Sequence, residues 1–398
     1  MNLTWAVIGG GVHGTHIALR LLLEGGVPRE ELRILDPGPR LLARWRSQTA
    51  ATGMEYLRSS SVQNLALEAG ALNRYARLHA VRSDVPFAPP YNRPSLSLFN
   101  AHCDHLIEQV HLDELHLRER VTEASLEEDR VTLRTSTGRE ISAQRIVLAL
   151  GASDQPLWPD WAPRGDARVQ HLFEIQDRPW PGSECGEIAV VGGGVSAAQA
   201  AIRLTDAGHR VRLISRHELR VEQFDVPPGW LGPRYMTGFR RTRSPERRRA
   251  MIDRARLSGT MPPDVQRVLR RRIELGRIDW LETEIRGVHC DGGALRLELA
   301  QGEDVTPGHI ILATGFESER PGGQMISSLI DSGSLPCASC GYPVVDTYLR
   351  WHERIHVSGP LAELELGPVA RNIAGARRAA ERILLSLEAG QPRCSPRQ

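Results

Sequence analysis

The sequence predicts an α/β protein that contains the same strand–turn–helix unit twice, the second copy inserted within the first. Two glycine-rich turns support this prediction, GGGVHG at residues 9–14 and GGGVSA at residues 192–197. Each turn follows a short apolar run and precedes a helical pattern of apolar residues. A second apolar run follows each helix, which completes two βαβ units. We therefore expect two Rossmann-like dinucleotide-binding domains.

The composition limits the classes of function. The chain has 398 residues, of which 41% are hydrophobic and 25% are charged, as in a packed enzyme of two or three domains. A net charge of +2 argues against a protein that coats nucleic acid. All 50 basic side chains are arginine, so Schiff-base chemistry and the P-loop lysine are excluded.

The sequence also carries expectations about location. It opens without a signal-peptide pattern, and no apolar stretch approaches the roughly 20 residues of a membrane-spanning helix. Six scattered cysteines suit a reducing compartment. We expect a cytoplasmic protein that uses a small-molecule substrate, without nucleic-acid or membrane partners.

In the first turn, each glycine has an expected task. Gly9 allows the tight turn, Gly11 lets the backbone approach a pyrophosphate, and Gly14 allows close packing of helix on strand. Asp36 follows Gly14 by 22 residues, the spacing of an acid that accepts hydrogen bonds from a ribose. The pyrophosphate would lie at the positive end of the helix.

The second turn has the same order of strand, glycine-rich turn and helix, with an alanine at the position of the last glycine. The strand after it ends in Ser215-Arg216 and carries no acid there. A hydroxyl and a guanidinium suit a ribose with a 2′-phosphate, which favours NADPH over NADH; alternatively, Arg216 only faces solvent. The residues expected to contact this dinucleotide are Gly192, Gly194, Ser196, Ala197, Ser215 and Arg216.

Three segments define the expected domains. Residues 1–155 and 309–398 form one domain, and residues 156–308 form the inserted one, with a helical Arg-rich insertion at 222–275. Residues 240–272 hold twelve arginines against three acids. They form either a solvated helical face or a positive rim for an anionic substrate or the NADPH phosphates.

The two turns, the ATG motif at residues 313–315 and the closing segments 357–360 and 366–372 resemble those of two-dinucleotide-binding flavoproteins. The chain is most similar to the N-hydroxylating flavin monooxygenases of the lysine and ornithine hydroxylase type. This resemblance implies an FAD domain interrupted by an NADPH domain. It also implies further cofactor contacts from Trp45, Gly151, Thr314, Gly315, Gly359, Leu366 and Gly367.

The implied activity is an NADPH-dependent monooxygenase (EC 1.14.13) that transfers one oxygen atom from O2 to a small amine or amino acid-like substrate. It could act as a homo-oligomer. His171, 21 residues before the second turn, is a candidate catalytic residue or a linker histidine. Gln63 and Asn64 could hydrogen-bond the flavin, or belong to an ordinary connecting loop.

Two other patterns compete with this interpretation. Cys337 and Cys340 form a CxxC motif that would suit an NADPH-dependent disulfide reductase, or an incidental pair in a loop. A non-catalytic flavin redox sensor is a further alternative. His102 and His105 stand three residues apart on an expected helix, but no further ligand accompanies them, so we expect no metal site and an amphipathic helix surface.

Overall fold

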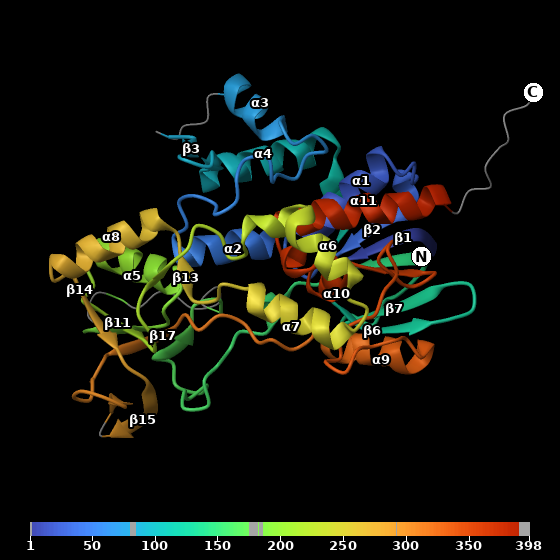
Figure 1. The fold of residues 1–398 in the computed structure, drawn as a ribbon. Coiled ribbons are helices and arrows are strands. Elements are labelled where there is room, and N and C mark those ends of the chain that lie inside the picture. Colours follow the sequence, from blue (N-terminus) through green and yellow to red (C-terminus); the bar gives the residue numbers. More distant parts are fainter. Residues whose placement is uncertain (1, 80–84, 175–181, 183–185, 292, 390–398) are drawn as a thin grey trace, which may run out of the picture.

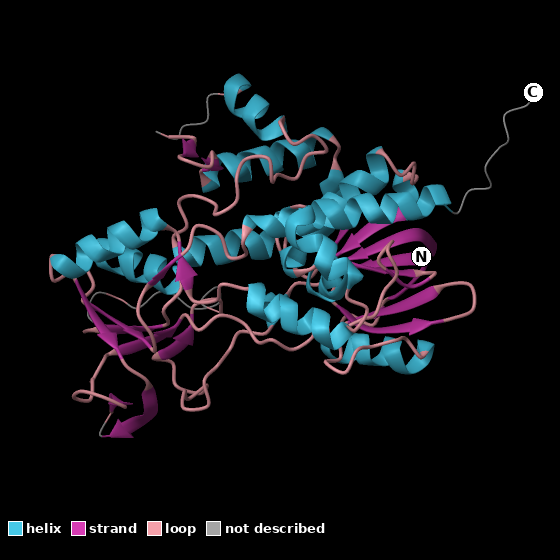
Figure 2. Cartoon of the chain, in the orientation of Figure 1, coloured by secondary structure: helices cyan, strands magenta, loops and turns pink. Residues whose placement is uncertain are grey.

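The computed structural model describes residues 2–79, 85–174, 182, 186–291 and 293–389. Two separate sheets, each with helices around it, lie at opposite ends of the molecule (Figures 1 and 2). The predicted α/β fold with two Rossmann-like units and a helical insertion is confirmed. Among the described helices, none has an apolar stretch that is long enough to cross a membrane.

The first sheet has a parallel centre with the strand order β5-β2-β1-β8-β19. β1 lies in the middle, and the chain order reverses between β1 and β8, which is where such sheets bind ligands. Antiparallel strands extend the sheet through β8 and β19. The strands are β1 (Asn2–Ile8), β2 (Leu32–Leu35), β5 (His116–Leu117), β6 (Val121–Leu126), β7 (Val131–Thr135), β8 (Glu140–Leu148), β18 (Arg350–His352) and β19 (Ile355–Val357).

The second sheet repeats this order with five parallel strands, β14-β11-β10-β17-β9. Its central strand β10 again stands beside the point of reversal, here between β10 and β17. β17, which pairs with β10, is the last strand of this sheet in chain order. After Leu312 the chain returns to the first domain. The strands are β9 (Val169–His171), β10 (Ile188–Val191), β11 (Val211–Ser215), β14 (Ile278–Glu282) and β17 (His309–Leu312).

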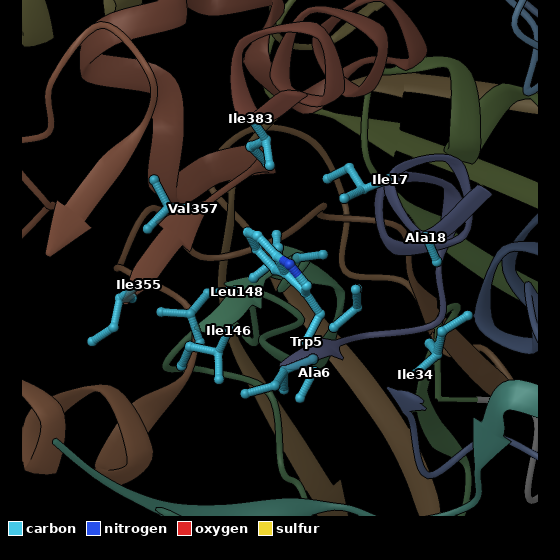
Figure 3. Packing of buried hydrophobic residues seen from close by; sticks show 14 of the residues in the cluster. Trp5, Ala6, Ile17, Ala18, Ile34, Ile146, Leu148, Ile355, Val357 and Ile383 are labelled. Carbon is cyan, nitrogen blue, oxygen red and sulfur yellow. The ribbon is translucent and has the colours of Figure 1, made fainter. Parts of the chain in front are cut away.

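The core of the first domain is built around Trp5 of β1, whose side chain is 1% exposed. Figure 3 shows Trp5 below Ile17 of α1 (Val12–Leu23) and Ile383 of α11 (Ile373–Ala389). α1 and α11 lie side by side over the sheet (Figure 1). The first and last helices of the chain are therefore held together by one apolar cluster.

In the second domain, α5 (Val195–Asp206) packs between the sheet and α8 (Pro263–Glu274). Four alanines on α5 are fully buried, and their small side chains let the helix approach the strands closely. α2 (Ala43–Thr52) of the first domain contacts α5, where the Arg203 guanidinium donates to the Ala51 carbonyl oxygen at 3.3 Å. This contact joins the two domains.

The expected helical insertion divides between the two domains. α6 (Pro233–Arg241) and α7 (Pro245–Ala255) pack against the last third of the chain, with Phe239 and Ile252 in one cluster with Tyr342 and Val369. α8 belongs to the second domain. Figure 1 shows α6 and α7 beside the first sheet.

The remaining elements are short or lie at the periphery. α3 and α4 form a helical layer at one side of the molecule, and β15 pairs with β16 as a hairpin beside the second sheet (Figure 1). They are α3 (Ala71–Leu78), α4 (Leu96–Gln109), α9 (Gly323–Gly333), α10 (Glu363–Leu366), β3 (Phe87–Ala88), β4 (Arg93–Pro94), β12 (Arg220–Val221), β13 (Thr260–Met261), β15 (Ile285–Asp291) and β16 (Ala294–Leu299), with 3-10 turns η1 (Arg29–Glu31), η2 (Leu112–Leu115), η3 (Ala152–Asp154), η6 (Pro228–Leu231), η7 (Gly359–Ala362) and η8 (Pro368–Arg371).

Candidate active site

The first glycine turn lies between β1 and α1, and two of its glycines are sterically required. Gly9 has a φ of +109°, and a Cβ atom there would stand 2.6 Å from the Ala149 carbonyl oxygen. A Cβ atom on Gly14 would stand 1.7 Å from the Gly9 carbonyl oxygen. Gly11 differs, because a Cβ atom there would meet no atom within 4 Å. Backbone atoms therefore crowd Gly9 and Gly14, whereas the space next to the Gly11 Cα atom is open.

The open side of this turn suits a pyrophosphate. Gly11 is the N-cap of α1, and no side chain caps the helix, so its first N–H groups and its positive dipole end face the open space. The Asp36 carboxylate accepts hydrogen bonds from the backbone N–H groups of Gly10 at 2.7 Å and Gly38 at 2.8 Å. Since a carboxylate has about four acceptor positions, it keeps capacity for ribose hydroxyls.

Two later segments meet the same turn. A Cβ atom on Gly359 would stand 3.4 Å from the Leu150 carbonyl oxygen, next to Gly151, and 3.8 Å from His13 Nδ1. His13 Nδ1 lies 2.8 Å from Ser358 Oγ, while its Nε2 is buried without a partner among the described atoms. Burial lowers the pKa of His13 to about 4, partly offset by backbone hydrogen bonds at Arg371 and Asn372. His13 therefore joins the start of α1 to Ser358 and to the backbone just before α11.

The second glycine turn repeats this geometry. Gly192 has a φ of +147°, and a Cβ atom there would stand 2.5 Å from the Ala313 carbonyl oxygen, as Gly9 would from Ala149. Gly194 is the N-cap of α5 and, like Gly11, has no side-chain cap. Ser196 and Ala197 follow in the first turn of that helix. The second site therefore also presents uncapped N–H groups to an anion.

At the end of β11, two residues remain candidates for a 2′-phosphate. Arg216 is exposed and borders the cleft described below. The Ser215 hydroxyl is committed: it donates to the His217 carbonyl oxygen at 2.9 Å and accepts from Trp280 Nε1 at 2.9 Å. The Ser215 side chain therefore shapes the turn, and the guanidinium is the group that remains available for a phosphate.

One cleft of about 1100 Å³ joins the second turn to the first domain. It begins at Gly192–Ser196, passes Thr314 and Gly315, and ends at Pro368, Arg371 and Asn372, just before α11. His13 of the first turn contacts that same end. The cleft therefore reaches from the second glycine turn to residues beside the first site, although no residue of the first turn lines it, and its volume suits a large ligand.

The first-domain end of the cleft is positively charged. Arg58, Arg256 and Arg371 border it, with Asp225 among them. Burial lowers the pKa of Arg58, although Asp225 and Glu222 oppose this shift. Burial likewise lowers the pKa of Arg256, against the charge of Glu363. A guanidinium whose pKa is lowered by burial lacks full compensation from anions.

Next to Arg256 and Arg371 lies a buried cluster of ion pairs. The Glu363 carboxylate is fully buried and is bound by Arg371 (Nε to Oε2, 2.9 Å), Arg256 and Arg249. Burial would raise the pKa of Glu363, but the hydrogen bond from Arg371 and the charges of Arg256 and Arg249 outweigh it and lower that pKa. Arg249 of α7 and Arg256 just after it thus point inward, whereas most of the arginine run is exposed, including Arg267, Arg270 and Arg271 of α8.

The candidate His171 ends β9 and is fully buried outside the residues that line the cleft. Its Nε2 lies 3.3 Å from Thr314 Oγ1, and its Nδ1 accepts from the Phe173 N–H at 3.3 Å. Burial lowers the pKa of His171 to about 4, partly offset by a backbone hydrogen bond at Gly315. It is therefore neutral at pH 7 and supports Thr314.

Asn64 does not have the free side chain that the sequence suggested. It is fully buried, its Nδ2 donates to the carbonyl oxygens of Ser61 and Ala69, and its Oδ1 accepts from the Ala66 N–H. These bonds use both of its donors, so we reassign Asn64 from flavin contact to loop support. Gln63 beside it is half-buried and keeps its proposed role.

Three further expected contacts, Trp45, Leu366 and Gly367, lie against protein. Trp45 of α2 packs on Phe99, with ring centroids 5.4 Å apart, and its Nε1 donates to Asn100 Oδ1 at 3.0 Å. Leu366 is buried, and a Cβ atom on Gly367 would stand 3.3 Å from Met236 Sδ of α6. Pro368 begins the 3-10 turn η8, and α11 begins at Ile373.

The competing thiol pattern lies away from the cleft. Cys337 and Cys340 are free and exposed, in a turn where Ser339 Oγ contacts Glu246 of α7 at 3.2 Å. Neither borders the cleft. Partial desolvation of the Cys337 thiol raises its pKa, against the charge of Arg320, which disfavours the reactive thiolate.

The histidine pair on α4 is partly inside the protein. His102 is 2% exposed and packs on the Tyr75 ring with centroids 5.2 Å apart, so its expected place on the helix surface is wrong. The helix turns this face toward α3, which the i, i+3 spacing alone did not reveal. Within the described residues, no group of three or more metal-ligating side chains is present.

Two family models match the chain between residues 6 and 247. Residues 6–153 match the FAD-NAD(P)-binding family model, and residues 97–247 match that of pyridine nucleotide-disulphide oxidoreductases. Over 110 residues the chain is 30% identical to ferredoxin–NADP reductase of Ignicoccus hospitalis, a stretch that covers 28% of this chain and 33% of that protein. The prediction of an N-terminal dinucleotide-binding segment is confirmed.

Solved structures match over almost the whole chain. Ornithine hydroxylase PvdA of Pseudomonas aeruginosa has a TM-score of 0.75 at 19% identity, covering 98% of this chain and 99% of that one. The chain has the two-dinucleotide-binding flavoprotein fold. Cadaverine monooxygenase DfoA of Erwinia amylovora, solved with FAD, gives 0.74 at 16% identity over 98% and 95%. Bacillithiol disulfide reductase of Bacillus cereus gives 0.64 at 16% identity over 98% and 100%.

This flavoprotein fold contains site residues that sequence reasoning missed. His217 lies beside the second turn, since a Cβ atom on Gly193 would stand 2.8 Å from its Cε1. Arg58 and Arg371 border the cleft from distant parts of the chain. His217 directly follows Arg216, and that position could have drawn attention to it. Arg58 lies in the same polar segment as Gln63 and Asn64, but the sequence could not show that its side chain borders the cleft.

Proposed function

We propose that this protein is an FAD-dependent NADPH oxidoreductase that works as a monooxygenase on a small amine or amino acid-like substrate. FAD occupies the first site and NADPH the second. The observation that carries this proposal is the cleft that runs from the second glycine turn to Arg371 and Asn372, whose backbone lies beside His13 of the first turn. A hydride donor and a flavin can meet only if their sites are joined in this way.

The protein's own residues bind and orient in this mechanism. The uncapped end of α5 holds the NADPH pyrophosphate and Arg216 holds the 2′-phosphate, while the uncapped end of α1 holds the FAD pyrophosphate beside Asp36. Bound FAD supplies hydride acceptance and the activation of O2. One oxygen atom goes to the substrate nitrogen and the other leaves as water. His171 remains neutral and positions Thr314 at the wall of the cleft.

Oxygen transfer is favoured over disulfide reduction by the positions of the cysteines. Cys337 and Cys340 do not border the cleft, and partial desolvation raises the pKa of Cys337. The expected cytoplasmic location and homo-oligomer are kept as parts of this proposal.

The test is a pair of stoichiometries on purified protein loaded with FAD. NADPH oxidation should consume O2, and addition of a suitable amine should give hydroxylated amine. The variant C337S/C340S should retain both activities, because neither half-reaction requires a thiolate. NADPH oxidation that requires a disulfide acceptor and is lost in this variant would replace the proposal with a reductase.

A further inference from the structure

The charges at the first-domain end of the cleft point to the class of substrate. Arg58 donates to the Glu222 and Gln223 carbonyl oxygens, and its pKa responds to the charge of Asp225. Asp225 in turn lies 3.4 Å from Asn372 Nδ2, next to Arg371. These residues form one continuous wall with three guanidinium groups against one carboxylate when Arg256 is included.

The Glu363 carboxylate behind this wall does not neutralise the charges of the arginines around it. Three guanidinium groups, of Arg249, Arg256 and Arg371, share the single Glu363 carboxylate. Their side chains are only 17–23% exposed, so water compensates them little. Arg249 also lies 3.8 Å from the exposed carboxylate of Asp253. The cluster therefore keeps an excess of about one positive charge at ordinary pH, partly removed from solvent.

The arginines of this wall also keep capacity to donate. Arg256 uses Nη2 for Glu363, and Arg371 uses Nε and Nη2, whereas a guanidinium carries five N–H groups. No other acceptor of the Arg256 guanidinium is present among the described residues. A planar carboxylate can take two parallel hydrogen bonds from such a group.

The phosphates of NADPH do not account for this charge. The uncapped end of α5 and Arg216 lie at the second-domain end of the cleft, beside Ser215 and Thr283. The acids Asp160 and Glu284 border that end, in the linker and next to Thr283. The excess of positive charge is thus at the other end, where a substrate must bind to meet the flavin.

We propose that this arginine wall, Arg58, Arg256 and Arg371, binds a carboxylate of the substrate, so that the substrate is an acidic amine of neutral or negative net charge. A diamine or a basic amino acid would bring a second cation against three guanidinium groups. This inference rests on the proposed function for the amine and its oxidation, but the carboxylate site itself can be tested without turnover.

The experiment compares three five-carbon ligands by calorimetry, glutarate, 5-aminopentanoate and 1,5-diaminopentane. The protein is loaded with FAD and saturating NADP⁺, which fills the phosphate sites, in buffer without phosphate or sulfate. Glutarate and 5-aminopentanoate should bind and 1,5-diaminopentane should not. R256Q should weaken glutarate binding about ten- to a hundredfold, the range for a charge-assisted hydrogen bond.

Two further variants control this result. Arg254 is exposed on the same helix and does not border the cleft, so R254Q should bind glutarate as the wild type does. R256K keeps the charge without the planar fork and should fall between wild type and R256Q. Thermal melting shows whether each variant is folded.

Four results would overturn the assignment: preferred binding of the diamine, no binding of any ligand, equal glutarate affinity in folded R256Q and wild type, or loss of binding in R254Q. If glutarate binds as expected but NADPH oxidation does not consume O2, the proposed monooxygenase fails and the carboxylate site stands. If O2 is consumed and glutarate does not bind, only this inference fails.

Discussion

The substitution Gly11→Val separates cofactor binding from folding. The Gly11 backbone has a φ of −75° and a ψ of −168°, which any residue adopts, and a Cβ atom there meets nothing within 4 Å. Replacement of glycine at a helix N-cap by an apolar residue costs about 1 kcal/mol or less. The variant without FAD should therefore melt about 2 to 4 °C below the wild type, at most.

The effect on the FAD-loaded protein should be larger. The pyrophosphate must approach the N–H groups at the start of α1 where the valine side chain would stand. FAD at a hundred times its Kd stabilises the wild type by about 2.7 kcal/mol, which corresponds to roughly 5 to 11 °C in Tm. Gly11→Val should lose nearly all of this increase, and the purified variant should be colourless.

Gly70→Val is the matched control. Gly70 is likewise a helix N-cap, and a Cβ atom there meets no atom within 4 Å, but it begins α3, away from the glycine turns. Thermal melting with and without FAD, together with the flavin absorbance, measures both effects. The reasoning is refuted if Gly11→Val retains the full FAD-induced shift, or if Gly70→Val loses it as well.

Four further outcomes follow from the same geometry. Arg216→Ala should raise KM for NADPH at least tenfold more than KM for NADH in steady-state kinetics, because only NADPH carries the 2′-phosphate; equal changes would exclude this role. Glu363→Gln should lower the free energy of unfolding by about 3 to 5 kcal/mol at pH 7 in urea titrations, since it leaves buried arginines unpaired. Because the folded-state pKa of Glu363 is lowered, its contribution is present above about pH 4.5, its unfolded pKa, and is lost as the pH falls through the folded pKa, so the difference between the two proteins should shrink in acid. His171→Gln should leave the pH dependence of kcat between pH 5 and 8 unchanged, because the His171 pKa of about 4 lies below that range; a lost acid limb would contradict this. C337S/C340S should oxidise NADPH at the wild-type rate in a spectrophotometric assay, and a large loss would implicate the thiols.

The glycine turns were predictable from sequence because their chemistry is local. Gly9, Gly14 and Gly192 are required by backbone contacts within one strand–turn–helix unit, and their spacing records those contacts. The repeated strand order follows from two such units in one chain.

The walls of the cleft were not predictable in the same way. Arg58 and Arg371 stand more than 300 residues apart and line the same cleft only because the two halves of the first domain come together in the fold. Asn64 resembled a free polar residue in a loop, and its three hydrogen bonds to neighbouring backbone groups became visible only in the structure. The division of the arginine run between solvent and Glu363 likewise depends on a partner more than 100 residues away.

The most direct test of the account is the ratio of NADPH and O2 consumed to hydroxylamine formed by the FAD-loaded protein with 5-aminopentanoate as substrate. The account predicts that all three are equal, with the other oxygen atom released as water. NADPH oxidation without O2 uptake, or O2 uptake with no hydroxylated product from any amine that binds, would contradict it.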